Sequence, residues 1–483
     1  MIFRDWLKEL DYTLLQGSVD VETEDVIYDS RKAAPGKVFV AMKGIRVDGH
    51  SFIPQVLKAG VRVLVTERPV EEELKNSGLS EDELKQVTVV MVEEGRHALA
   101  LLSAARFDHP AKKLVMIGVT GTKGKTTTTH MIRAILLAAG KKVGMIGTTG
   151  TVIGDVVTPT LNTTPESYEL HQAFAQMVEA GCEYAVMEVS SQGIKMHRTD
   201  GLYFNYAIFT NISPDHIGPG EHADFEEYLY YKTRLLNMCG IGLVNKDDEH
   251  APQIIKAANC ELYTYSEESK EADFVASDIS YVSQPDFVGT EFHISGKYDM
   301  EVRLGIPGLF NVVNALAAVS VCSFLGLDQA RISHALENIR VNGRMEIVYT
   351  SERCTVLVDY AHNAGSMESL LSTLRDYKPK RLGCVFGCGG NRSKDRRYSM
   401  GEIGGKMADL SIITADNSRY EKVEDIIADI RGSIEKTGGK FIEIPDRREA
   451  IRYSILHAQP GDMVAVIGKG HEDYQEINGV RHH

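Results

Sequence analysis

The stretch Lys113-Leu-Val-Met-Ile-Gly-Val-Thr-Gly-Thr-Lys-Gly-Lys-Thr-Thr127 decides the fold of this chain. Its apolar run, 114–119, predicts a buried β-strand, and a helix is expected over 126–139. Between them lies a glycine-bearing loop whose backbone N–H groups, with the helix N-terminus, form a cradle for phosphate groups. Lys125 adds a positive charge, and the Thr126 hydroxyl can reach Mg²⁺. The sequence therefore predicts a nucleoside triphosphate site formed by Gly121, Thr122, Lys123, Gly124, Lys125, Thr126 and Thr127.

The loop is a variant of the P-loop pattern, which places a glycine five residues before Gly124. Val119 occupies that position, and Gly118 and Gly121 supply the flexible backbone instead. Glycine-rich turns after strands are common, so the loop alone is weak evidence. The lysine–threonine pair, the preceding strand and the following helix together make the phosphate-binding interpretation specific.

Composition and charge exclude several classes of protein. The chain has 483 residues, a length that corresponds to about three domains. Its net charge of −14 argues against general binding to nucleic acid or to an anionic membrane. Seven cysteines are scattered without a C-x-x-C pair, so neither a disulfide framework nor a cysteine zinc site is indicated. The start predicts an amphipathic helix over 1–10 rather than a signal peptide, and no apolar run reaches the ~18 residues of a membrane span.

From these features we expect a cytoplasmic monomer whose partners are small molecules, with neither nucleic acid nor membrane among them. Three domains of α/β type are expected, over 1–105, 106–340 and 341–483. In the central domain, apolar strands alternate with helices, which is typical of a parallel sheet. Those strands are expected at 114–119, 143–146, 184–189 and 206–210.

The third domain shows four short apolar strands, each followed at once by glycine or polar residues. The strands are expected at 355–358, 382–386, 410–413 and 463–467. In open α/β sheets ligands bind beyond the carboxyl ends of the strands, where these polar segments should meet. The sequence therefore predicts a second site in the third domain.

Two side chains of the central domain are candidate Mg²⁺ ligands. Glu188 lies at the end of an apolar strand, where an acid without a partner would be costly to bury. A metal would explain this position, and a salt-bridged acid at a strand end is the alternative. His216 follows the next strand and is a second candidate, although a loop histidine is more often a surface residue. From spacing alone, Lys232 is an ordinary helix lysine.

Taken together, these motifs resemble the Mur ligase family, most closely the members that add the third peptide residue to UDP-N-acetylmuramoyl-L-alanyl-D-glutamate. The resemblance covers essentially the whole chain. Besides the loop at 121–127, its markers are Tyr28–Arg31, Asn162–Glu166, Glu188–Gln192, His197-Arg198, Asn211–His216, Gly308–Asn314, Gly343–Glu346, Asp359–His362, Gly389–Arg392, Asp416–Arg419 and Gly468–Gln475.

The resemblance implies a central P-loop ATPase domain, an N-terminal UDP-binding domain and a C-terminal Rossmann-like domain. It implies catalytic roles for Lys125, Glu188, His216, Lys232 and Arg344. Thr126, Glu188, His216 and a CO₂-derived carbamate on Lys232 would hold Mg²⁺. ATP would also meet Asn311, Asn314, Arg344, Asp359 and His362. The UDP-muramoyl-dipeptide would contact Tyr28, Ser30, Ile45, Arg46, Val47, Asn162, Thr163, Thr164, Ser190, Met196 and Arg198.

The incoming amino acid would meet Arg392, Asp416, Asn417, Ser418, Arg419, Gly468 and Glu472. A meso-diaminopimelate side chain ends in both ammonium and carboxylate, which Glu472 and the two arginines can match. A lysine substrate ends only in ammonium and would leave an arginine unmatched. We therefore favour diaminopimelate, with L-lysine as the alternative.

This chain departs from the family pattern at several positions. Ser418 replaces a proline of the diaminopimelate-specific motif, and Lys123 stands where many members carry asparagine. His362 is followed by Asn-Ala-Gly, a variation shared with lysine-adding members, and Met196 occupies a position that is often polar. The chain stops at His483, so a final segment of the third domain is expected to be missing.

The expected reaction is ATP-dependent amide formation through an acyl phosphate, in the synthesis of peptidoglycan precursors. A sibling ligase that polyglutamylates folate is a further alternative, which the UDP-side markers disfavour. A P-loop kinase or a nucleotide-operated switch is a remote alternative from another class.

Overall fold

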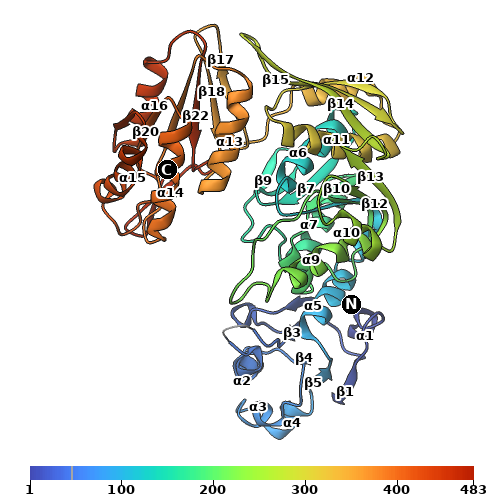
Figure 1. Ribbon diagram of the computed structural model, residues 1–483. Coiled ribbons are helices and arrows are strands. Elements are labelled where there is room, and N and C mark those ends of the chain that lie inside the picture. The colour runs from blue at the N-terminus through green and yellow to red at the C-terminus, as the bar shows by residue number, and fades with distance from the viewer. Residues whose placement is uncertain (45–46) are drawn as a thin grey trace. The chain divides into compact units, whose positions relative to one another are not determined.

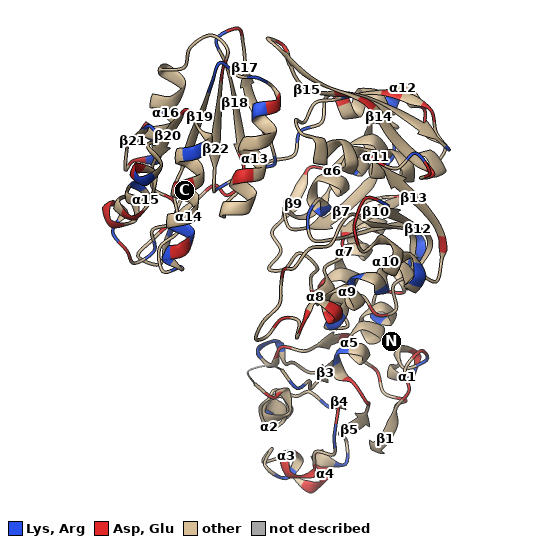
Figure 2. Cartoon of the chain, in the orientation of Figure 1, with Lys and Arg blue, Asp and Glu red and all other residues tan. Residues whose placement is uncertain are grey.

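Figure 1 shows the computed structural model, which describes residues 1–44 and 47–483. The described residues divide into two compact units. The first unit comprises 1–129 and 140–264, and the second comprises 130–139 and 265–483. Figure 2 shows Lys and Arg interleaved with Asp and Glu along the described chain. In this described part, no helix combines the length and the apolar character that crossing a membrane would require.

The first unit begins with a five-stranded sheet in the order β1-β5-β4-β3-β2. All neighbours are parallel except β1 and β5. Val38 and Val40 enter one apolar cluster and Phe39 enters another, so both faces of the sheet are covered. The strands are β1 (Thr13–Gln16), β2 (Asp25–Ile27), β3 (Lys37–Val40), β4 (Val63–Thr66) and β5 (Thr88–Met91). The helices are α1 (Phe3–Trp6), α2 (Ile53–Lys58), α3 (Glu71–Lys75), α4 (Glu81–Leu84) and α5 (Gly95–Arg106).

The helix expected over 1–10 is shorter than predicted. Only α1 is helical, and Leu7 and Leu10 then follow through turns whose N–H groups donate to carbonyls three residues back. Trp6, Leu7 and Leu10 are nevertheless buried. Tertiary packing therefore satisfies the apolar pattern without a second and third helical turn.

The second sheet of this unit runs β12-β11-β6-β10-β7-β8-β9. Its parallel core confirms the four predicted strands as β6 (Val115–Thr120), β7 (Val143–Gly147), β10 (Tyr184–Glu188) and β11 (Phe204–Phe209). It also contains β12 (Cys239–Asn245), which was not predicted. An antiparallel extension follows in β8 (Gly150–Ile153) and β9 (Val156–Thr158). Met116 and Met187 pack in one core with Phe174 and Met177 of α7. The helices are α6 (Lys125–Ala138), which crosses the boundary, α7 (Ser167–Glu179), α8 (Ser191–Lys195), α9 (Phe225–Thr233) and α10 (Ala251–Ala257).

The second unit contains an antiparallel ribbon and a six-stranded sheet. The ribbon is β14 (Phe274–Gln284), β15 (Phe287–Gly296) and β16 (Met300–Leu304), and β13 (Glu261–Ser266) precedes it. The sheet runs β17-β18-β22-β19-β20-β21, with only β17 antiparallel. These strands are β17 (Glu346–Thr350), β18 (Cys354–Asp359), β19 (Arg381–Phe386), β20 (Leu410–Ile413), β21 (Phe441–Glu443) and β22 (Asp462–Ile467).

Helices of the second unit connect these strands. They are α11 (Leu309–Phe324), α12 (Gln329–Glu337), α13 (Ala364–Asp376), α14 (Lys394–Met407), α15 (Val423–Thr437) and α16 (Arg447–Leu456), and a hairpin of β23 (Gln475–Ile477) and β24 (Val480–His482) follows. The predicted strands β18, β22, β19 and β20 are neighbours in parallel register, so their carboxyl ends lie along one edge. The predicted polar segments of the third domain therefore share that edge.

Candidate active site

The predicted phosphate loop lies between β6 and α6. Gly121 has φ +143°, and a Cβ there would lie 1.9 Å from Thr210 Oγ1, so only glycine fits. Gly124 also has a positive φ, +88°. Nζ of Lys125 donates to the carbonyl oxygens of Gly121 at 2.8 Å and Thr122 at 3.1 Å. The loop and helix thus have the arrangement that binds phosphate groups.

The end of β11 holds this loop in place. The Thr122 N–H donates to the Asn211 carbonyl at 2.8 Å, and the Lys123 N–H donates to Asn211 Oδ1 at 2.9 Å. The Asn211 amide donates to the Lys123 carbonyl at 3.1 Å. Asn211 belongs to a motif noted in the sequence, but its bracing role was missed. The only available signal was a polar residue directly after an apolar strand.

Glu188 is buried at the carboxyl end of β10, as predicted, with its side chain among hydroxyl and amide donors. Its Oε1 accepts from Thr126 Oγ1 at 3.0 Å and from the Thr148 N–H at 2.9 Å, and its Oε2 accepts from Thr148 Oγ1 at 3.1 Å. A Cβ at Gly147 would lie 2.2 Å from Oε1, so glycine leaves the room that the carboxylate occupies. The salt-bridge alternative is not what the structure describes, because the partners of Glu188 are neutral groups. The contribution of Thr148 was missed from the sequence.

Lys232 is buried in α9, and its environment is unusual for a lysine. Its Nζ donates to the Gly121 carbonyl at 2.7 Å, the same oxygen that accepts from Lys125. Burial lowers the pKa of Lys232 well below its usual value, and the nearby charge of Lys125 lowers it further. The Tyr228 ring centroid lies 4.6 Å from Nζ. The structure therefore places an amine with a lowered pKa beside the phosphate loop.

His216 is the most exposed of the residues predicted to hold the metal. Its side chain is 59% exposed, and Nδ1 lies 3.0 Å from Glu221 Oε1. Within the described residues, its ring pairs with Glu221 rather than with Glu188 or Thr126. Its role as a metal ligand stays a prediction.

The residue types around the loop fit Mg²⁺, which prefers carboxylate and hydroxyl oxygens. Thr126 and Glu188 supply such oxygens 3.0 Å apart. Lys232, as a free amine, does not suit Mg²⁺, whereas a carbamate on Nζ would supply further oxygens. Thr126, Glu188 and a modified Lys232 are thus the residues that would hold the ion.

Four of the predicted muramoyl-dipeptide residues come from the segment before α7 and from the two ends of α8. Arg198 forms an ion pair with Glu166 at 2.6 Å and donates to the Thr164 carbonyl at 3.0 Å. Ser190 Oγ donates to the buried Thr164 Oγ1 at 3.1 Å. Thr163 Oγ1 lies 3.1 Å from Thr148 Oγ1, the hydroxyl that also contacts Glu188. These contacts bring the predicted substrate residues next to the predicted metal site.

The remaining residues predicted for this substrate are less closely grouped. Asn162 is exposed, and Met196 is the C-cap residue of α8. Tyr28 donates to both carboxylate oxygens of Glu169 in α7, at 2.9 and 3.0 Å. Ser30 begins a short 3₁₀ helix (Ser30–Lys32) and Val47 is exposed, while Ile45 and Arg46 lie outside the described residues.

The second unit holds the residues predicted to contact ATP outside the phosphate loop, among them Arg344 for the phosphates and Asp359 with His362 for the ribose. Asp359 accepts from the N–H groups of Met345 at 2.8 Å and Ala361 at 2.7 Å, and burial raises the pKa of this carboxyl group. The Arg344 guanidinium lies 4.9 Å from the Tyr360 ring centroid. His362 is exposed, with Nδ1 2.9 Å from the Tyr360 carbonyl oxygen. The tyrosine between the predicted Asp359 and His362 was not assigned a role from the sequence.

Asn311 and Asn314 lie in the first turns of α11 and are both buried. The Asn314 amide donates to Asn311 Oδ1 at 3.2 Å, and the Asn311 amide donates to the Pro307 carbonyl at 2.7 Å. The pair is therefore ordered by its own hydrogen bonds. Contact with adenine stays a prediction.

The predicted amino-acid residues meet at the carboxyl edge of the six-stranded sheet. Lys469, which the sequence reasoning missed, donates to Glu472 Oε2 at 2.6 Å and to Asn417 Oδ1 at 2.8 Å. The Asn417 amide also lies 3.3 Å from Glu472. Partial burial acts to raise the pKa of Glu472, but hydrogen bonds and charge from Lys469, with smaller contributions from Asn417 and Tyr360, outweigh it and lower the pKa. Glu472 is thus ionised and already paired with a cation.

Arg419 joins the same cluster with a left-handed backbone, φ +50°. Its guanidinium donates to the Gly390 carbonyl at 2.8 Å and lies 3.3 Å from Glu476 Oε2. A Cβ at Gly468 would lie 2.6 Å from Asp416 Oδ2, so glycine permits this close approach. Ser418 is buried and Arg392 is exposed. The cluster therefore combines Arg419 with an acid and an amide, and the clamp of a substrate carboxylate by Arg392 and Arg419 stays a prediction.

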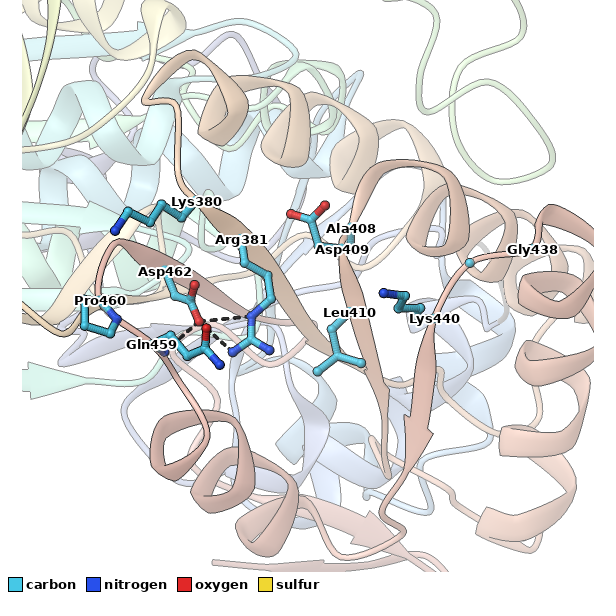
Figure 3. Close-up of a pocket in the computed structure, with 11 residues that line it drawn as sticks. Lys380, Arg381, Ala408, Asp409, Leu410, Gly438, Lys440, Gln459, Pro460 and Asp462 are labelled. Carbon is cyan, nitrogen blue, oxygen red and sulfur yellow. Dashed lines mark hydrogen bonds and ion pairs between the residues drawn. The ribbon is translucent and has the colours of Figure 1, made fainter.

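A pocket at the opposite edge of this sheet contains none of the predicted site residues. Figure 3 shows it at the strand starts, with Lys380 and Arg381 beside Asp462. Arg381 pairs with Asp462 at 2.6 Å. Because ligands of such sheets bind at the carboxyl edge, this pocket is not the predicted amino-acid site.

Three family models match successive parts of the chain. They are the Mur ligase family catalytic domain over 23–107, the Mur ligase middle domain over 119–322, and the Mur ligase glutamate ligase domain over 343–470. The predicted α/β fold of three domains is thereby confirmed.

Relatives of the whole chain carry a common name, UDP-N-acetylmuramoyl-L-alanyl-D-glutamate–2,6-diaminopimelate ligase. The protein of that name from Caldanaerobacter subterraneus subsp. tengcongensis is 39% identical over 98% of this chain and 95% of its own length. The one from Clostridium perfringens is 38% identical over 98% and 96%. A solved structure with the same name is 30% identical, with a TM-score of 0.72 over 95% of this chain and 92% of its own.

Proposed function

This chain belongs to the Mur ligase family, and from that premise we propose that it joins meso-diaminopimelate to UDP-N-acetylmuramoyl-L-alanyl-D-glutamate. The new amide forms at the D-glutamyl side-chain carboxylate, and ATP is converted to ADP and phosphate. The observation that carries this proposal is the identity of 39% over 98% of the chain to a relative that is named for this activity. The family assignment also leaves no support for the kinase or switch alternative.

The chemistry follows from the low reactivity of a carboxylate toward amines. A carboxylate oxygen attacks the γ-phosphorus of ATP, ADP leaves, and an acyl phosphate forms. The amine of the amino acid then attacks the acyl carbon, and the C–O bond to phosphate breaks. Lys125 and the loop N–H groups stabilise charge on the phosphoryl oxygens during the first step. Arg344 is proposed to act on the same phosphates.

Mg²⁺, when bound, neutralises charge on the phosphate oxygens. Glu188 and Thr126 orient toward each other at 3.0 Å and would hold the ion. Lys232 has a lowered pKa, and only its uncharged form can attack CO₂. The resulting carbamate would replace a cation by an anion beside the phosphate loop. The lowered pKa of Lys232 therefore supports the proposed carbamate modification.

The choice of diaminopimelate rests on the cluster around Arg419. In this proposal Glu472, which accepts from Lys469 at 2.6 Å, shares its negative charge with the distal ammonium, and Arg419 offers donors for the distal carboxylate. L-Lysine lacks that carboxylate and would gain no ion pair with Arg419, which disfavours it.

One assay tests the proposal. Purified protein is supplied with ATP, Mg²⁺ and the UDP-muramoyl-dipeptide, with diaminopimelate or L-lysine in separate reactions, and the product mass is measured. We expect the diaminopimelate amide, and phosphate release that depends on all substrates. An amide formed with L-lysine alone would contradict the substrate choice. Equal phosphate release without any amino acid would contradict the ligase itself.

A further inference from the structure

Three metal-binding side chains converge outside the proposed active centre. His97 lies in α5, and His197 and Asp200 lie in the turns after α8. Nδ1 of His97 lies 2.6 Å from Asp200 Oδ2, and Nδ1 of His197 lies 2.8 Å from the same oxygen. One nitrogen of each ring and one carboxylate oxygen all lie within 4.8 Å of one another. Segments about a hundred residues apart thus bring two imidazoles to one carboxylate.

This donor set is typical of zinc and similar transition metals. Three protein ligands of histidine and carboxylate type, with solvent in the fourth position, form many zinc sites. With metal–ligand distances of about 2.0–2.1 Å, tetrahedral geometry separates the ligand atoms by about 3.3 Å. The observed nitrogen–oxygen separations of 2.6 and 2.8 Å therefore need to open by about 0.7 and 0.5 Å. The rings of His97 and His197 are 44% and 39% exposed, which leaves access for an ion and for water.

The surrounding charges also favour a cation. Glu94, at the N-cap of α5, is a second acid whose charge acts on both histidines, in addition to Asp200. Arg234 is a positive group that acts on His197. The His197 backbone is held at φ +55°, a conformation that histidine adopts infrequently, and its ring is thereby placed beside Asp200.

We propose that His97, His197 and Asp200 bind one divalent transition-metal ion of the zinc class. The ion would join α5, next to the five-stranded sheet, to the turn that carries Arg198. Arg198 contacts Thr164 and Glu166, so the site would stiffen the proposed muramoyl-dipeptide region. This consequence rests on the proposed function, whereas metal binding itself does not.

The probe is Co²⁺, a coloured substitute for Zn²⁺, and no substrate is added. The full-length protein is titrated with Co²⁺ in excess Mg²⁺, which occupies oxygen sites and competes poorly for imidazole. We expect a visible absorption band of tetrahedral type that saturates at one equivalent. His97→Gln and Asp200→Asn keep groups that can hydrogen-bond within the cluster, so the fold should persist. Each should weaken Co²⁺ binding at least about tenfold, as the loss of even an outer-shell partner does.

His293→Gln is the matched control, because His293 also pairs with carboxylates, Glu301 at 2.9 Å and Asp299 at 3.5 Å. It should bind Co²⁺ as the wild type does. Zn²⁺ should raise the thermal unfolding midpoint of the wild type but not of His97→Gln. Absence of the band in the wild type, or equal affinity in the wild type and both cluster variants, would overturn the proposal. No substrate is present in these titrations, so their failure would leave the ligase function untouched.

Discussion

Replacing Glu188 by Gln should remove the charge of the proposed metal site while keeping its shape. The glutamine carbonyl can take the place of Oε1 and accept from Thr126 and the Thr148 N–H. Its amide can donate to Thr148 Oγ1, which now lies 3.1 Å from Oε2. Every buried partner therefore keeps a hydrogen bond, and the free energy of unfolding should change by no more than about 1 kcal/mol.

The effect on the reaction should be far larger than the effect on stability. At an effective dielectric constant of about 20, two unit charges about 4 Å apart interact with about 4 kcal/mol. Loss of one carboxylate charge beside a divalent cation should cost at least that much. An increase of about 4 kcal/mol in the barrier lowers the rate roughly 10³-fold. We expect this loss in kcat together with a higher Mg²⁺ requirement.

The assay follows product formation over a Mg²⁺ titration, with thermal unfolding of the same preparations. Glu183→Gln is the matched control, because Glu183 precedes the same strand but is 51% exposed and pairs with Lys141. Such a surface pair contributes at most about 1 kcal/mol, and the control should remain active. If Glu188→Gln kept more than about a tenth of the activity at an unchanged Mg²⁺ midpoint, the carboxylate would not hold the metal.

Three further variants test other parts of the account. Gly147→Ala puts a Cβ 2.2 Å from the Glu188 carboxylate and should lower kcat at least about tenfold. Gly432→Ala is the control, because its Cβ would have no atom within 4 Å, and it should keep the wild-type kcat. Equal activities of the two variants would argue against this packing constraint. Arg419→Ala should raise the KM for diaminopimelate about 10-fold or more while leaving the KM for ATP unchanged. Arg431→Ala is its control, because Arg431 forms an exposed ion pair with Glu443. His171 is buried with its pKa lowered to about 3, so the folded state rejects a proton that the unfolded chain accepts below pH 6.5. Stability should fall by about 2.3 kcal/mol between pH 6.5 and 4.5, and denaturant unfolding of His171→Leu should show a pH loss smaller by that amount; identical slopes would refute the assignment.

The sequence predicted the elements that position the site because each one combines two local signals. The strands β6, β10 and β11 are apolar runs that end in glycine or polar residues, and both features are visible without a structure. Glu188 was identified because an acid interrupts such a run. The parallel sheet alone then accounts for the burial of the strand and for the position of Glu188 at the carboxyl edge.

The missed features depend on contacts between distant segments. Thr148 lies 40 residues from Glu188, and Asn211 lies 88 residues from Lys123, so no local pattern marks either partner. Lys469 lies in a glycine-containing segment and was assigned no role from the sequence, although its ammonium pairs with Glu472. The edge strands β17 and β21 were also missed, since one carries exposed Val and Tyr and the other has three residues.

The central claim is that ATP converts a substrate carboxylate into an acylating group that an amine then captures. The most direct test follows ¹⁸O from a labelled D-glutamyl side-chain carboxylate during turnover with diaminopimelate. Because the C–O bond to phosphate breaks in the second step, each inorganic phosphate released should carry one labelled oxygen. Product formation with unlabelled phosphate would contradict the claim.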